Sequence, residues 1–291
     1  MKFAIIGGSG KMGQWFARFL KQEGMTVFIS GKNQEKLQEI SQRLELPAGS
    51  NREIVSQADV IILSVPVGNF ENVAMEIAPC LQPWQIVIDI TSIKEMPVDT
   101  MHRYFAENLV LGTHPLFGPG ARSVAGMNFV LTPTDSREQA LAQKAREFLV
   151  QRGARVTFMS PRDHDKMMCI ILGLSHFVAL VTADVLSEKY DLELMKSVSG
   201  ISFKVLLTLV ESVVSEDPEL YSAIQMSLKD LPEIEASFVR KAQEWAELVR
   251  DHEKDRFIVR MDYLKKFFEK GADFGKSYDE MYRLVNQRND G

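Results

Sequence analysis

A glycine-rich loop near the N-terminus has the spacing of a phosphate-binding turn. It follows the pattern G-x-G-x-x-G and comprises Gly8, Ser9, Gly10, Lys11, Met12 and Gly13. The loop comes directly after an apolar run at residues 3–6 and opens a helical pattern, which is the context that gives this motif its meaning. The first glycine permits a tight turn, the second a close approach to pyrophosphate, and the third close packing of helix on strand. We therefore predict that the first half of the chain binds a nicotinamide dinucleotide.

The end of the second predicted strand bears on which dinucleotide is bound. Sites for NAD usually place Asp or Glu about 20 residues beyond the loop, where the carboxylate binds the ribose 2′-hydroxyl. Here the residues are Ser30, Gly31, Lys32 and Asn33, so no acid repels a 2′-phosphate. Ser30 can donate a hydrogen bond and Lys32 can supply positive charge. We expect NADP, with NAD as the alternative if Lys32 is simply solvated.

Three further segments lie at the carboxyl ends of predicted strands and contain residues suited to chemistry. They are residues 58–66, which end in Val65 and Pro66, residues 89–94 with Ser92 and Lys94, and residues 112–119 with His114. In open α/β sheets, ligands bind outside the carboxyl ends of the strands, so all three segments point to one crevice. Histidine suits proton transfer because its ordinary pKa lies near neutral pH. Lys94 either lends positive charge to this crevice or is a solvated lysine.

Together with the glycine loop, these segments resemble the prephenate/arogenate dehydrogenase family. The most specific part is G-T-H-P-x-F-G-P at residues 112–119, paired with D-x-T-S-x-K at residues 89–94. Residues 163–168, 174–177 and 217–221 are also similar to that family. The resemblance implies oxidative decarboxylation of prephenate to 4-hydroxyphenylpyruvate in tyrosine biosynthesis, with hydride transfer to NADP or NAD. It also implies an architecture like that of 6-phosphogluconate dehydrogenase, with a homodimer built through the helical domain.

The resemblance also implies roles for individual residues. His114 matches the family's catalytic base, and Ser92 matches a serine that bonds both the base and the substrate hydroxyl. His176 matches a histidine near the substrate side chain, and His164 is expected nearer the nicotinamide end or the domain seam.

The expected clamp for a substrate carboxylate departs from the family pattern. The position of the family's clamping arginine is Ser212, and a second arginine position is Lys204. Lysine gives a point charge rather than a planar fork, so the clamp has three candidates. These candidates are Lys204, Arg122 and Lys166. The choice between prephenate and arogenate therefore stays open.

Two other classes of protein fit the glycine loop. One is another hydride-transfer enzyme of this architecture, such as a 3-hydroxyacid dehydrogenase or a deazaflavin–NADP oxidoreductase. The other is a non-catalytic protein that binds NADP and regulates a partner. The presence of both Ser92 and His114 favours a prephenate or arogenate dehydrogenase over either.

The pattern of elements predicts two domains. Strands are expected at residues 3–6, 26–30, 59–65, 86–90, 109–111, 128–131 and 155–158, with helices at 11–22, 33–43 and 136–152. This alternation favours a parallel sheet with right-handed crossovers, and helical periodicity takes over after residue 158. We predict an α/β Rossmann-type domain at residues 1–158 and an all-α substrate and dimerisation domain at residues 159–291. Because the chain starts at a strand and ends in helices, neither a chorismate mutase nor a regulatory domain is expected.

Residues 167–186 form a nearly continuous apolar segment that contains His176. A helix that is apolar on all sides must be covered on all sides, and the polar residues within it favour a buried helix over a membrane span. The helical half of one subunit offers limited cover, so we expect a second subunit to pack on it as a homodimer.

The composition is that of an ordinary globular protein, with 45% hydrophobic and 25% charged residues. The net charge of −5 argues against a nucleic-acid partner, which needs a basic footprint. Cys80 and Cys169 lie far apart with no metal-ligand spacing around them, so we expect reduced thiols, no metal site and a cytoplasmic location. The apolar N-terminal run is too short for a signal peptide.

Overall fold

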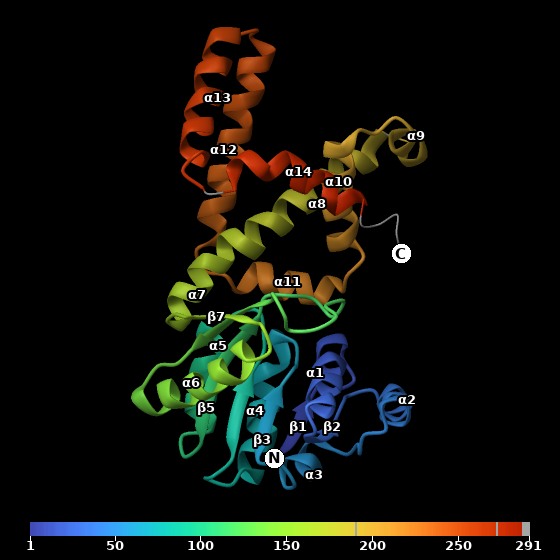
Figure 1. The fold of residues 1–291 in the computed structure, drawn as a ribbon, viewed down its shortest axis with the longest axis vertical. Coiled ribbons are helices and arrows are strands. Elements are labelled where there is room, and N and C mark those ends of the chain that lie inside the picture. Colours follow the sequence, from blue (N-terminus) through green and yellow to red (C-terminus); the bar gives the residue numbers. More distant parts are fainter. Residues whose placement is uncertain (190, 272, 287–291) are drawn as a thin grey trace. The chain divides into compact units, whose positions relative to one another are not determined.

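The computed structural model describes residues 1–189, 191–271 and 273–286. The chain forms two compact units (Figure 1). The first comprises residues 1–168 and 226–228, and the second comprises residues 169–225 and the chain from Lys229. The helix α7 (Pro161–Met168) belongs to the first unit, although it follows the boundary that we predict after residue 158.

The first unit is built on a seven-stranded sheet in the order β2-β1-β3-β4-β5-β6-β7. Its register brings the carboxyl ends of the central strands to one edge, because Ile6 pairs with Leu63, Leu63 with Asp89, and Asp89 with Gly112. The strands are β1 (Lys2–Ile6), β2 (Thr26–Ile29), β3 (Val60–Leu63), β4 (Ile86–Asp89), β5 (Leu109–Pro115), β6 (Asn128–Thr132) and β7 (Arg155–Phe158).

Helices cover both faces of this sheet, as the mostly parallel arrangement requires. One face carries α1 (Lys11–Gln22), α2 (Gln34–Leu44) and α6 (Ser136–Val150), whose apolar side chains join one core cluster with residues such as Trp15, Ile40 and Leu149. The other face carries α3 (Asn51–Val55), α4 (Phe70–Ile77) and α5 (Glu95–Tyr104), which share a second cluster. Two short turns of helix, η1 (Val67–Asn69) and η2 (Ala78–Cys80), flank α4.

The sheet differs from the sequence prediction at β5 and β6. The expectation of a parallel sheet is wrong for this pair, since β5 and β6 are antiparallel from Gly112 opposite Thr132 to Pro115 opposite Phe129. The reason is the connection at residues 116–127, which contains no helix in the structure and so supplies no crossover. Pairing with β6 also extends β5 four residues beyond the predicted end at Leu111, so His114 lies inside the strand and not just after it.

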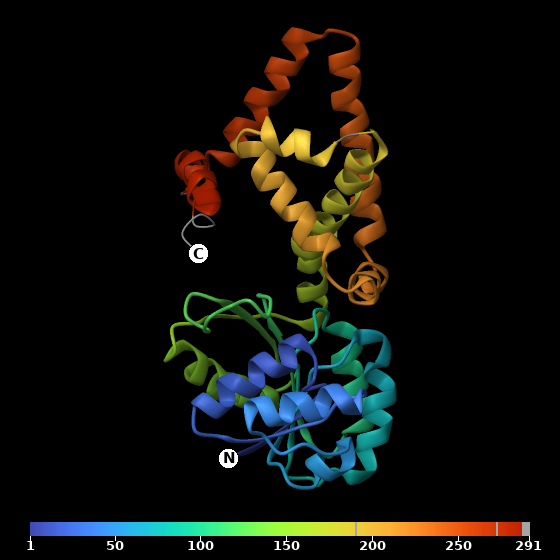
Figure 2. The ribbon, with the colours of Figure 1, turned by 90° about the vertical axis from the view of Figure 1, so that its right-hand side faces the viewer.

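The second unit is helical. The π-helical turn η3 (Cys169–Leu174) approaches α12 (Leu231–Arg250) closely, since a Cβ built on Gly173 would lie 2.5 Å from Leu231 Cδ1. Helix α8 (Ser175–Lys189) packs on α10 (Ile201–Val214), and α10 packs on α14 (Ser277–Asn286). Helix α13 (Lys254–Phe268) turns back from the end of α12, and the two helices spread apart from that turn (Figure 2). The other elements are α9 (Leu192–Ser197), α11 (Pro218–Ser227) and η4 (Phe274–Lys276).

The predicted apolar helix is largely uncovered in a single chain. By length and composition alone, the continuous helix Pro161–Glu188 could cross a membrane. It is one such helix in the described part of the chain, and a single helix of this kind is weak evidence for a membrane span. Only 17% of its most apolar window is buried, so the cover that we predicted does not come from its own chain. The exposed apolar side chains on it include Ile170, Ile171, Leu180, Val181 and Val185.

Candidate active site

The glycine loop joins β1 to α1 through a backbone that leaves no room for a side chain at Gly7, Gly8 and Gly13. Gly7 has φ +81°, a conformation that L residues rarely adopt, and a Cβ on it would lie 2.1 Å from the Ser64 carbonyl oxygen. A Cβ on Gly13 would lie 2.3 Å from the Gly7 carbonyl oxygen. The left-handed turn residue is therefore Gly7, not Gly8 as the motif reading proposed, while Gly13 permits the close packing of helix on strand.

The start of α1 fits the phosphates of a dinucleotide. Gly10 is the N-cap residue and offers no side-chain cap, and the first turn of the helix contains no acidic residue. The backbone N–H groups and the helix dipole at this end favour an anion. The end of β3 borders the same loop, because a Cβ on Gly7 would lie 3.2 Å from Val65 Cγ1, and Pro66 next to it is exposed.

The residues that we predicted to contact the ribose 2′-phosphate, Ser30, Gly31 and Lys32, differ in how accessible they are. Ser30 is only 1% exposed, and its hydroxyl donates to Asn51 Oδ1 at 2.6 Å, so it is not an open donor for a 2′-phosphate. Gly31 lies against Ser9, whose Oγ is 2.2 Å from the position of an added Cβ. Lys32 is exposed, which leaves it as the charged candidate among the residues we predicted here.

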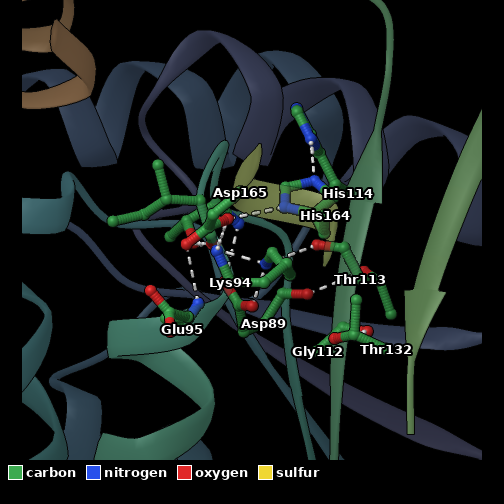
Figure 3. A network of polar contacts seen from close by, with 11 residues as sticks. Asp89, Lys94, Glu95, Gly112, Thr113, His114, Thr132, His164 and Asp165 are labelled. Atoms are coloured by element: carbon green, nitrogen blue, oxygen red, sulfur yellow. Dashed lines mark hydrogen bonds and ion pairs between the residues drawn. The ribbon is translucent and has the colours of Figure 1, made fainter. Parts of the chain in front are cut away.

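A buried ion pair stands at the carboxyl ends of β4 and β5 (Figure 3). The Nζ atom of Lys94 pairs with Asp89 Oδ2 and donates to the Thr113 carbonyl oxygen at 2.7 Å. Both side chains are fully buried, so the reading of Lys94 as a solvated lysine is wrong. Burial raises the pKa of Asp89 and lowers the pKa of Lys94, and the attraction between the two charges opposes both shifts.

His114 lies beside this pair on β5 and is 5% exposed. Its Nδ1 is 2.8 Å from Nε2 of His164, and its other ring nitrogen points away from the network (Figure 3). Burial, with smaller contributions from His164 and Lys94, holds the pKa of His114 well below its ordinary value. The imidazole is therefore neutral at pH 7 and able to accept a proton.

Ser92 lies half-buried between β4 and α5, in the segment where we predicted it. Its neighbours are anchored, since the Thr91 amide donates to Asp89 Oδ1 and the Thr91 hydroxyl donates to the Ile93 carbonyl oxygen. Within the described part of the chain, Ser92 makes no hydrogen bond to His114. The predicted bond between Ser92 and His114 is therefore absent, and Nδ1 of His114 faces Nε2 of His164 instead.

His164, which we expected nearer the nicotinamide end or the domain seam, lies on α7, the last helix before the first unit's boundary at Met168. It is completely buried on α7, with Nδ1 2.7 Å from Asp165 Oδ1 and Nε2 against His114. Sequence reasoning missed both Asp89 and Asp165 as functional candidates. A signal was available, because each is an acid within a segment already chosen for its histidine or lysine.

The cationic candidates for a substrate clamp lie in different places. Arg122 lines a hollow of about 420 Å³ beside α1 with Arg18 and Arg152, and His114 does not line it. Lys166 is exposed on α7, next to Asp165. Among the hydrogen bonds and ion pairs of the described residues, none links Arg122 or Lys166 to His114 or His164.

The second unit holds the remaining predicted residues. His176 on α8 lies with its ring centre 4.4 Å from that of Tyr221, and burial lowers its pKa. Its Nδ1 is buried and has no hydrogen-bond partner among the described residues. Lys204 is exposed on α10, and Ser212 on the same helix donates its hydroxyl to the Leu209 carbonyl oxygen.

Two family models match the chain in succession. The model for the nucleotide-binding domain of prephenate dehydrogenase matches residues 16–158, and the model for the dimerization domain of prephenate dehydrogenase matches residues 160–263. The chain belongs to the prephenate/arogenate dehydrogenase family.

Known members of this family are similar along most of the chain. The probable arogenate/prephenate dehydrogenase of Methanocaldococcus jannaschii is 30% identical over 96% of this chain, which spans 64% of that protein's length. The T-protein of Enterobacter agglomerans is 28% identical over 98% of this chain and 72% of its own length.

Solved structures of family members share the fold. The Aquifex aeolicus prephenate dehydrogenase, solved with hydroxyphenyl propionate and NAD+, has a TM-score of 0.77 at 22% identity, covering 93% of this chain and 99% of that one. The Synechocystis arogenate dehydrogenase has a TM-score of 0.71 at 19% identity, with coverage of 93% and 99%. Both the prephenate and the arogenate branches of the family therefore have this architecture.

The buried pair predicts a large stability effect at Lys94. Lys94→Met leaves Asp89 buried without its counter-charge, so we expect the free energy of unfolding to fall by about 3–5 kcal/mol. The matched control is Lys241→Met, which removes the exposed ion pair with Glu244 and should cost far less, because solvent screens that pair. Urea unfolding followed by circular dichroism measures both, and equal losses would contradict the role of burial.

Proposed function

We propose that this chain oxidatively decarboxylates prephenate to 4-hydroxyphenylpyruvate, with NADP as the preferred hydride acceptor. The observation that carries the proposal is a buried, neutral His114 on the strand next to β4, in the sheet whose first strand leads into a phosphate-binding loop. Membership of the family supports the reaction class. Arogenate is the alternative substrate, because relatives named for either substrate are similar to this chain.

The residues divide the chemistry between them. A dinucleotide whose pyrophosphate is held at the glycine loop would supply the nicotinamide that accepts the hydride. His114 accepts the proton of the substrate hydroxyl on its Nε2 as the hydride departs from the ring carbon that bears that hydroxyl. The ring carboxylate leaves as carbon dioxide, which aromatisation of the ring drives. Ser92, half-buried in the loop after β4, is free of a bond to His114 and suits the substrate hydroxyl as a hydrogen-bond partner.

A dianionic substrate needs local positive charge, because the net charge of −5 repels it at long range. Lys204 on α10 is the exposed cation that stands at a family arginine position, and His176 offers a buried nitrogen without a partner in the described chain. We assign substrate binding to these two residues. Lysine binds a carboxylate as a point charge, so the clamp is looser than an arginine fork.

The deciding experiment is a direct assay. The protein is mixed with prephenate or arogenate and with NADP or NAD, and the absorbance of the reduced nicotinamide is followed. Turnover with prephenate supports the proposal, and turnover with arogenate alone reassigns the substrate. No turnover with either substrate overturns the proposal in favour of a 3-hydroxyacid dehydrogenase, a deazaflavin–NADP oxidoreductase or a non-catalytic regulator.

His114→Asn should lower kcat by about 10²–10⁴-fold, because it removes the general base, while the cofactor dissociation constant changes little. Since the pKa of His114 is depressed, its basic form persists at mildly acidic pH. The acid limb of the wild-type kcat/KM profile should therefore lie well below pH 6.5. Turnover close to wild type in His114→Asn, or an acid limb at or above pH 6.5, would refute this assignment.

Lys32 predicts the cofactor preference. The exposed ammonium can pair with a 2′-phosphate, so Lys32→Ala should raise the KM for NADP several-fold and leave the KM for NAD nearly unchanged. Initial rates with the two cofactors measure the effect. Lys36→Ala, in the first turn of α2, is the matched control. A wild-type preference for NAD would remove the case for NADP.

We also propose a homodimer in the cytoplasm, formed through the apolar helix of the second unit. The exposed side chains Leu180, Val181 and Val185 support it, as does the match to a dimerization domain. Light scattering at micromolar concentration should give twice the chain mass. Val181→Glu should shift the protein toward monomer, whereas Met75→Glu, at an exposed methionine of α4, should not. A wild-type monomer would disprove the dimer.

A further inference from the structure

A chain of three side chains leads from a helix end to His114. Oδ1 of Asp165 lies 2.7 Å from Nδ1 of His164, and Nε2 of His164 lies 2.8 Å from Nδ1 of His114. His164 is completely buried and Asp165 is 7% exposed. All three residues belong to the first unit, and Figure 3 shows the two contacts that link Asp165 to His164 and His164 to His114.

Asp165 is placed so that its carboxylate can only accept. Its Oδ1 accepts from the backbone N–H of Lys94 at 2.7 Å, and its Oδ2 accepts from the backbone N–H of Glu95 at 2.9 Å. These are the first residues of α5, and Lys94 as the N-cap residue makes no side-chain cap of its own. The carboxylate therefore caps α5 from α7, where the helix dipole stabilises a negative charge.

The direction of the hydrogen bonds follows from that anchor. A carboxylate that only accepts requires His164 to donate from Nδ1. Burial lowers the pKa of His164, so the ring is neutral at pH 7 and its Nε2 carries a lone pair. His114 must then donate from Nδ1 to that lone pair. The remaining nitrogen of His114, Nε2, is left unprotonated.

We propose that Asp165 and His164 are positioning residues that fix His114 in its Nδ1–H form, so that Nε2 is the atom that accepts the substrate proton. This inference rests on the proposed role of His114 as the base. In the step itself, the substrate O–H bond breaks and an N–H bond forms at Nε2, which turns His114 into a cation. His164 and Lys94 are the other titratable groups acting on it, and the Asp165 carboxylate lies one hydrogen-bonded ring away.

Histidine ¹⁵N NMR tests the arrangement without any substrate. The chain has five histidines, and His114→Asn and His164→Leu assign the two signals by their loss. We expect both rings at pH 7 to be protonated at Nδ1 and unprotonated at Nε2. In Asp165→Asn the side-chain amide can donate to His164, which reverses the chain and moves the His114 proton to Nε2. A wild-type His114 protonated at Nε2, or no change in Asp165→Asn, would overturn the proposal.

Kinetics give the second readout. His164→Leu keeps the two backbone bonds of Asp165 but removes the acceptor next to His114, so kcat should fall by about 10²-fold or more with little change in KM or cofactor affinity. His164→Gln retains an acceptor at the end of its side chain and should recover part of that loss. The matched control is His102→Asn, which removes a comparable histidine–carboxylate pair with Glu138 elsewhere in the first unit and should leave kcat unchanged.

The two proposals fail in different ways. If the wild-type protein turns over prephenate or arogenate but His164→Leu matches its kcat, the positioning role is wrong and the function stands. If the wild-type protein has no turnover, the proposed function is wrong, and the NMR result alone decides the tautomer. If Asp165→Asn does not fold because α5 loses its cap, His164→Leu still decides the outcome.

Discussion

The pairing of Lys94 with Asp89 is the interaction on which the site depends. Two buried opposite charges are stable only when they form an ion pair and their remaining donors and acceptors are hydrogen-bonded. Here the lysine reaches from the start of α5 to the end of β4 and to the Thr113 carbonyl oxygen on β5. One side chain thereby ties together three elements next to His114. The dry surroundings that make the pair necessary also keep the imidazole neutral.

Much of the first unit follows from local patterns in the sequence. The glycine loop and the apolar runs each specify their element through neighbours close in the chain. Local patterns do not predict the direction of β6. That direction depends on the connection at residues 116–127, and an irregular connection leaves no periodic pattern in the sequence. The extension of β5 through His114 follows from that pairing, so it was out of reach for the same reason.

The site shows the same division between local and distant information. His114 and Ser92 could be chosen from short motifs, and both lie at the predicted edge of the sheet. The partners of His114 could not, because His164 is 50 residues away and its contact exists only once α7 packs beside α5. The burial of Lys94 could not be predicted either, because nothing in its immediate sequence distinguishes a buried lysine from a solvated one. The hydroxyl of Ser30 donates to Asn51, 21 residues later, a contact that no local pattern indicates.

The capping of α5 by Asp165 has a consequence for how this protein can change over time. One carboxylate both caps a helix and accepts a hydrogen bond from a buried histidine, so in the proposed arrangement a replacement at this position lowers stability and turnover together. Selection or engineering that alters what the enzyme acts upon therefore has little freedom around α5 and α7. Variation is less constrained at exposed positions of α10 such as Lys204 and Ser212, because neither side chain caps another helix or contacts a buried histidine among the described residues.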